Sequence, residues 1–177
     1  MTSIIVDTVI DHCRDNDLWD FYALEGLMGL VEFSKGNLVS GYRKAMAVQK
    51  MYLRSGSFYM NAVAESIMGK THLQVILSKK PVPFSVFMRD FFWIVGHVPS
   101  AFHRAKSSFT KAIEITERQG LQGMLAEAWR DMGTLYMTKK KHAQAGKCFT
   151  TAIKLYKELG SLKLCAEIQQ QLEAAKT

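Results

Sequence analysis

Residues 126–160 read AEAWRDMGTLYMTKKKHAQAGKCFTTAIKLYKELG, and this stretch decides the fold. Small residues stand at Gly133 and Ala145, where the two helices of a hairpin would cross, and large aromatic residues stand around them. The residues that define the pattern are Trp129, Met132, Gly133, Tyr136, Ala145, Phe149 and Ala152. Helical spacing on both sides of a basic turn predicts two closely packed antiparallel helices.

The order and spacing of these residues resemble the tetratricopeptide repeat, whose pattern is W-x2-L-G-x2-Y followed by A-x3-F. Met132 stands where the pattern has leucine, and Gly160 ends the unit in place of the usual proline. The resemblance implies an all-α fold, a right-handed α-α superhelix of about eight to nine helices. In such a solenoid, neighbouring hairpins bury a continuous core between them.

The same spacing recurs along the chain and gives the repeat a register. The recurring positions of the second helix are Ala105, Phe109, Ala112 and Gly120, and, more degenerately, Gly41, Ala45, Val48 and Gly56. The first helix recurs as well. Gly29, Gly69 and Gly133 lie 13 residues after Asn16, Gly56 and Gly120 of the preceding turns. The period is therefore about 40 residues, against the usual 34, and helices about one turn longer would explain the difference.

The register predicts a single domain over 1–177. We expect a half repeat or capping helix over 1–15, repeats over 16–56, 57–120 and 121–160, and a capping helix over 161–177. The expected helices span about 3–14, 17–34, 38–54, 58–78, 84–96, 100–119, 122–138, 142–159 and 162–175. Because the chain starts inside a repeat, a piece cut from a longer protein and a plain N-terminal cap are both consistent with it.

The spacing of the repeat positions is interrupted once, in the repeat 57–120. Counted from Gly69, the expected small residue falls on Pro81, whereas the matching Ala105 lies 24 residues later. We therefore expect residues 79–99 to be an insertion that carries its own short helix. A degenerate repeat helix is the alternative.

The segment AKSSFTKAIEITERQG at 105–120, together with 126–160, is similar to the long tetratricopeptide repeats at the C-terminal end of large bacterial signalling proteins. Those proteins carry a nucleotide cyclase or a transcription-regulator domain beside an ATPase module. The similarity covers 100–177 well and 1–78 weakly. It implies a non-catalytic protein–protein interaction scaffold that belongs to a larger regulator.

Composition sets the class of protein and its surroundings. The net charge is +7 and the sequence pI about 9.3, which permits contact with nucleic acid without indicating it, because the basic residues are scattered. Cys13, Cys148 and Cys165 have no metal-ligand spacing, and an odd, unpaired set fits a reducing compartment. The N-terminus lacks the pattern of a signal peptide, and no apolar run is long enough to span a bilayer. We therefore expect a cytoplasmic location and no membrane partner.

Tetratricopeptide stacks usually bind partners in the groove lined by the first helix of each hairpin, and the resemblance places that groove on this chain. The groove positions are Gly26, Leu30, Phe33, Ser66, Lys70, Leu73, Gln74, Glu127, Arg130, Thr134 and Met137. The lysine and asparagine clamp of chaperone-binding repeats is not matched. Lys70 and Arg130 are the candidates for contact with an acidic ligand side chain, and the alternative is that both are ordinary solvent-facing residues.

Residues 84–95 form the most apolar stretch, in which only Arg89 and Asp90 are charged. A helix that is apolar on nearly all sides must bury most of its surface. Packing inside its own stack is one interpretation. A dimer contact or partner-docking surface is another, and its residues would be Phe84, Phe87, Phe91, Phe92 and Trp93. Insertion into a membrane surface is the third, although the polar side lacks clustered Lys or Arg.

Motifs for catalysis are missing from the sequence. Met68-Gly69-Lys70-Thr71 resembles the end of a phosphate-binding loop, but position 64 is alanine where that motif has glycine. The five histidines are dispersed and form no H-E-x-x-H motif. We therefore predict no catalytic residue, no cofactor and no metal. The predicted partner is a protein or peptide, and the alternatives are a homodimer through 84–95 and a nucleic-acid-associated regulator suggested by charge alone.

Overall fold

The computed structural model describes residues 35–54, 56–77 and 84–174, and before them Gly26, Met28, Gly29, Val31 and Glu32. The helices in these ranges are α3 (Leu38–Arg54), α4 (Phe58–Leu77), α5 (Phe84–His97), α6 (Ala101–Arg118), α7 (Gln122–Met137), α8 (His142–Glu158) and α9 (Leu162–Ala174). Only helices and turns occur in this part of the chain, which confirms the all-α prediction there.

The helix count differs from the prediction. Seven helices lie in the described ranges, against about eight to nine expected for the whole chain. The helices expected at 3–14 and 17–34 fall outside the described residues, apart from single positions of the second. The remaining helices begin and end within a few residues of the bounds that the sequence pattern gave.

Turns with left-handed residues connect the helices. Gly120 and Gly160 have φ of 66° and 69°, which glycine adopts without strain. In the turn after α6, Leu121 N–H donates to the carbonyl of Thr116 at 2.9 Å, and after α8 Ser161 N–H donates to that of Tyr156 at 2.9 Å. These bonds satisfy carbonyl groups that the helix ends leave free. Between α7 and α8 the left-handed position is taken by Lys140, with φ of 54°.

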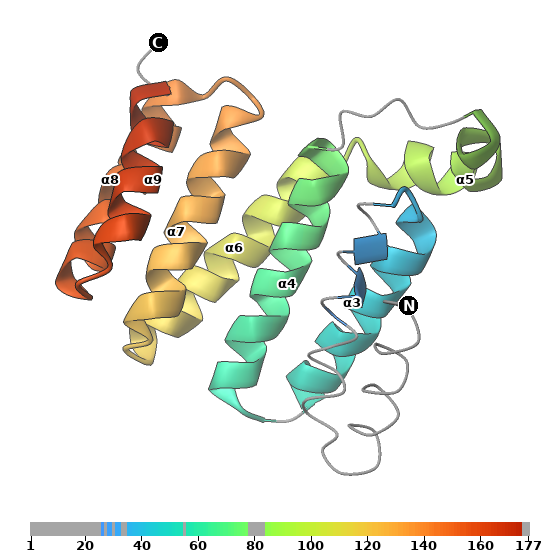
Figure 1. The fold of residues 1–177 in the computed structure, drawn as a ribbon. Helices are drawn as coiled ribbons and strands as arrows, with labels where there is room; N and C mark the ends of the chain where they lie inside the picture. The colour runs from blue at the N-terminus through green and yellow to red at the C-terminus, as the bar shows by residue number, and fades with distance from the viewer. Residues whose placement is uncertain are drawn as a thin grey trace, which may run out of the picture.

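The helices form two layers. Figure 1 shows α4, α7 and α9 on the viewer's side of the stack, with α6 and α8 behind them. The closest pairs are α4 with α6 and α7 with α8, and α6 also packs against α7 and α8 against α9. Helix α4 thus pairs with α6 directly, although α5 lies between them in the sequence.

Glycine against phenylalanine marks the crossing in each of these two pairs. A Cβ atom on Gly69 would lie 2.5 Å from the Phe109 ring, and one on Gly133 would lie 2.5 Å from the Phe149 ring. Alanines surround both rings with 0% exposure, namely Ala105, Ala112, Ala145 and Ala152. Gly29 is also tight, because a Cβ there would lie 2.9 Å from the carbonyl oxygen of Gly41.

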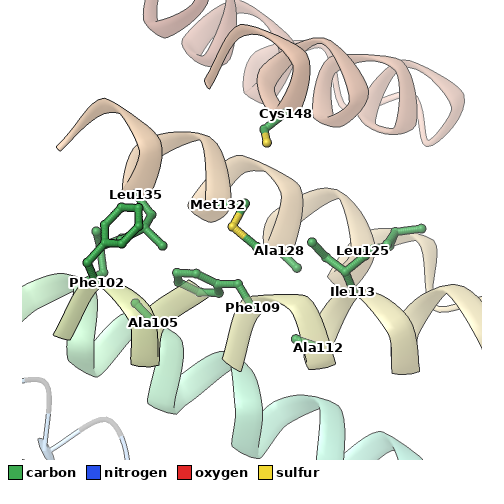
Figure 2. Close-up of a cluster of buried hydrophobic side chains, with 11 residues drawn as sticks. Phe102, Ala105, Phe109, Ala112, Ile113, Leu125, Ala128, Met132, Leu135 and Cys148 are labelled. Carbon is green, nitrogen blue, oxygen red and sulfur yellow. The ribbon is translucent and has the colours of Figure 1, made fainter. Parts of the chain in front are cut away.

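The main core runs between α6 and α7. Figure 2 shows the side chains of Phe102, Phe109 and Ile113 from α6 pointing toward Leu125, Met132 and Leu135 from α7, with Cys148 of α8 above. A second cluster lies among α7, α8 and α9 and includes Phe149, Tyr156 and Ile168. Trp129 and Tyr136 pack against both clusters and so join them into one core.

The apolar helix α5 is less buried than its sequence predicted. Phe92 is 90% exposed, and Met88, Phe91 and Val95 are exposed as well, whereas Asp90 is buried. Figure 1 shows α5 at the edge of the stack, where α3 is its main neighbour among the described helices. For the described side chains, the expectation that α5 buries most of its surface is therefore wrong. The side toward α3 carries Trp93, whose ring packs edge-on against Tyr42.

The Gly133→Ala variant tests the close crossing. The added methyl group would collide with Phe149, which is fully packed and cannot move aside, so we expect a loss of about 1–3 kcal/mol in the free energy of unfolding. Gly146→Ala is the matched control in α8, because its Cβ would meet only Leu172 at an ordinary 3.7 Å. We expect that change to stabilise the protein by roughly 0.5–1 kcal/mol. Urea unfolding followed by circular dichroism measures both, and equal effects would contradict the crossing described here.

Candidate functional site

A cluster of four charged side chains lies between α4 and α7. The Lys70 ammonium lies 2.6 Å from Glu127 Oε1 and 3.7 Å from Asp131 Oδ2. The Arg130 guanidinium contacts the same Glu127 oxygen at 3.3 Å and Asp131 Oδ1 at 2.9 Å. Both cations are thus shared between both carboxylates, and the cluster is neutral as a whole.

Burial and charge act in opposite directions on the two acids. Burial disfavours ionisation of Glu127, but the hydrogen bond and charge of Lys70, with Arg130, outweigh it and hold the pKa below the usual 4.5. Asp131 is more deeply buried, and burial raises its pKa above the usual 3.8 despite Arg130 and Lys70. Its Oδ2 atom accepts no hydrogen bond from another described residue. Glu127 is therefore the acid whose ionisation stabilises the cluster.

A cavity of about 470 Å³ opens beside the ion-pair cluster at the C-terminal ends of α4 and α7. Its lining residues are Ile76, Leu77, Thr134, Met137, Thr138 and Lys140. The hydroxyl groups of Thr134 and Thr138 donate to carbonyl groups of their own helix, those of Arg130 and Leu135. The cavity is mainly apolar, and Lys140 is the charged residue in its lining. We call the cluster and this cavity together the α4–α7 groove.

The structure brings together most of the groove residues that the sequence predicted on α4 and α7. Lys70, Glu127 and Arg130 form the ion-pair cluster, and Thr134 and Met137 line the cavity. Ser66 is half-buried and Gln74 is exposed on α4. Leu30 and Phe33 lie outside the described residues.

Two predicted groove positions are corrected by the structure. Leu73 is buried in the main core with Phe102 and Phe109, so it supports the helix and offers no surface to a ligand. Gly26 is buried too, because a Cβ there would lie 3.1 Å from Ile67. In both cases close packing against neighbouring helices places the residue in the interior and not on the surface of the groove.

Asp131 and the cavity residues Ile76 and Leu77 were not predicted from the sequence. Asp131 stands between Arg130 and the core residue Met132 and was not among the predicted groove residues. A buried acid beside an arginine is a signal that could have been used, since buried charges are normally paired. Ile76 and Leu77 carried no signal, because their place opposite Met137 depends on how α4 crosses α7.

The described residues contain no group of three or more His, Cys, Asp or Glu that could hold a metal ion. Within the same ranges, none of the helices is both long and apolar enough to cross a membrane. Cys148 and Cys165 are buried free thiols, and burial raises the pKa of Cys148 to about 11. A thiol that stays protonated at neutral pH is a poor nucleophile.

Comparison with known proteins gives no relative: no family model matches the chain, and neither the curated proteins nor the solved structures contain a match.

Glu127→Gln tests the electrostatics of the cluster. Because the folded pKa of Glu127 is lowered, its ionisation stabilises the fold above about pH 4.5, and this contribution is lost as the pH falls through the folded pKa. We expect the variant to be less stable than the parent at pH 7 by less than about 1 kcal/mol, since Glu127 is 41% exposed and screened by solvent.

The difference between parent and variant should shrink below about pH 4.5. Urea titrations at pH 7, 5 and 4 measure it, and Glu167→Gln on the exposed side of α9 is the control, with no effect expected at any of these values. A difference that does not change with pH would show that the charge of Glu127 contributes nothing.

Proposed function

We propose that this chain is a tetratricopeptide-type scaffold, a right-handed superhelix that binds a protein or peptide and catalyses no reaction. The support is the repeated glycine–phenylalanine crossing at Gly69–Phe109 and Gly133–Phe149, in the same order and register as the sequence pattern. Small residues that let helices approach, with a core shared between neighbours, are what a stacked repeat needs. The scaffold would serve as part of a larger bacterial signalling or transcription regulator in the cytoplasm.

The α4–α7 groove is the proposed binding surface, and its cavity is the observation that carries the proposal. Its lining is mainly apolar, with Ile76, Leu77 and Met137, and it opens beside a polar rim. Lys70 and Arg130 are already neutralised by Glu127 and Asp131, so the cluster has little attraction left for an acidic ligand. We therefore propose a ligand peptide that is anchored by an apolar side chain in the cavity, with its polar groups against the cluster.

Met137→Glu tests this mode of binding. Peptides would first be selected from a random display library on the parent protein, and their affinities measured by fluorescence anisotropy. The selected peptides should share an apolar anchor, and Met137→Glu should weaken them at least tenfold because it places a charge in the cavity. Leu162→Glu is the control, since Leu162 is 74% exposed at the start of α9 and lies away from the cavity.

The proposal fails if no peptide is selected, or if Met137→Glu and Leu162→Glu have the same effect. If the selected peptides lack an apolar anchor but still bind Met137→Glu more weakly, the α4–α7 groove is the binding surface and the proposed apolar anchor is wrong.

The exposed side of α5 favours a second candidate function, self-association. Met88, Phe91, Phe92 and Val95 follow helical spacing and lie on one exposed side of α5. Trp93 is turned toward Tyr42 and does not belong to this surface. The side chains of Phe84 and Phe87 lie outside the described residues. Apolar side chains in one exposed row are typical of an interface, and a second copy of the same helix would match them by symmetry.

Phe92→Glu tests self-association. We expect the parent to show a dimer in multi-angle light scattering at high protein concentration, and the variant to be a monomer, because like charges would face each other across the two-fold axis. Leu53→Glu provides a control at an exposed leucine of α3. A parent that stays monomeric at all concentrations would exclude the dimer.

A further inference from the structure

A polar cavity of about 270 Å³ lies between α3, α4 and α6. Its polar lining residues are Tyr42, Gln49, His72, Arg104, Ser107 and Ser108, and no acidic side chain lines it. Two of the three helices that enclose it, α3 and α6, contribute nothing to the α4–α7 groove. The cavity is therefore separate from the proposed peptide site.

A second cavity of about 400 Å³ occupies the equivalent place one repeat later, between α6, α7 and α8. The register of the glycine–phenylalanine crossings relates the two cavities residue by residue. Met68 of the first corresponds to Met132 of the second, so the frame is shared. Other positions differ in polarity: Gln49 corresponds to Ile113, His72 to Tyr136, Arg104 to Gln144 and Ser108 to Cys148. The later cavity has polar lining residues of its own, namely Thr110, Glu114, Gln144, Lys147 and Thr151, but at the positions of His72 and Arg104 it has neither an imidazole nor a guanidinium.

Several donors in this polar cavity lack partners. His72 is 4% exposed, and its ring contacts Tyr42 but forms no hydrogen bond with another described residue. Ser108 is 8% exposed and is likewise unpaired within the described ranges. Arg104 is exposed, and among the described residues its guanidinium donates to the Tyr42 hydroxyl alone, at 3.3 Å. The unpaired donors of His72 and Ser108 are not fully buried, so a ligand that brings acceptor oxygens can reach them from the open side of the cavity.

Charge on the surrounding helices favours an anion. The charged residues of α3 are Arg43, Lys44, Lys50 and Arg54, and none is acidic. In contrast, α4 and α7 together hold two basic and three acidic residues. Glu65 contacts Gln49 at 3.4 Å, but Lys111 at 3.6 Å balances its charge. Arg104 is thus the charged side chain in the lining of the cavity, and no acidic side chain opposes it there.

We propose that the cavity between α3, α4 and α6 binds a phosphate group, either free or on a small monoester. The Arg104 guanidinium would form the charged contact, and the hydroxyls of Tyr42, Ser107 and Ser108 and one ring N–H of His72 would donate to the remaining oxygens. Burial, with the nearby charges of Arg104 and His97, lowers the pKa of His72 to about 4, so its ring is neutral at pH 7 and keeps one N–H. The volume is slightly below the about 300–1,000 Å³ of sites for drug-sized ligands, which favours a small ligand.

Histidine side-chain NMR of the full chain tests the proposal, with inorganic phosphate and phosphoserine titrated at constant ionic strength. The His72 resonances, assigned with His72→Gln, should shift and saturate at one ligand per chain. Arg104→Gln copies the residue of the equivalent position in the later repeat, and we expect it to weaken binding at least tenfold. Lys106→Gln removes the same charge from the same helix outside the cavity, and should change the affinity less than twofold.

The results distinguish a phosphorylated ligand, free phosphate and a general basic surface. Tighter binding of phosphoserine than of phosphate would assign the site to a phosphorylated ligand, and the reverse to free phosphate. Equal losses in Arg104→Gln and Lys106→Gln, or binding of duplex DNA with the same pattern, would show a general basic surface and overturn the cavity site. If Arg104→Gln unfolds, Ser108→Ala replaces it, with a loss of at least threefold expected. Met137→Glu should leave phosphate binding unchanged, so this proposal and the peptide groove can fail separately.

Discussion

In both central hairpins a phenylalanine ring lies directly on a glycine of the facing helix, and the position of every neighbouring helix depends on this contact. Phe109 lies so close to Gly69 that the glycine position of α4 has no room for a side chain, and Phe149 on Gly133 does the same for α7 and α8. The alanines around the rings then allow the next helix to approach. Because interiors are packed to crystal-like density, the contact fixes the crossing and leaves little freedom to slide.

This constraint also positions the two candidate sites. On one side the crossing brings Lys70 of α4 toward Glu127 and Asp131 of α7, and a neutral ion-pair cluster results. On the other side it leaves two small cavities, one between α3, α4 and α6 and one between α6, α7 and α8. Two copies of one cavity, with different linings, come from the same backbone arrangement. Chemistry can therefore vary at these positions while the packing is kept.

The sequence predicted the helices well where the repeat pattern is complete, because glycine, alanine and aromatic residues at fixed spacing leave few alternatives. It predicted the face of α7 that carries Glu127, Arg130 and Met137, since helical spacing alone decides which residues share a face. It failed for Leu73 and for the burial of α5, because both depend on which helices become neighbours. The cavity around His72 and Arg104 was not predicted for the same reason, because its lining residues come from three different helices, α3, α4 and α6.

Helix α5 interrupts the sequence of a repeat without interrupting its packing. The direct packing of α4 against α6 does not involve α5, which lies beside α3 at the edge of the stack. Helix α5 meets the stack through Trp93 and His97, whose rings pack against Tyr42, and through the buried Asp90, so the exposed side of the helix is the part that can change in composition. A scaffold of this kind can acquire a different surface on α5 while the packing of its other helices stays the same.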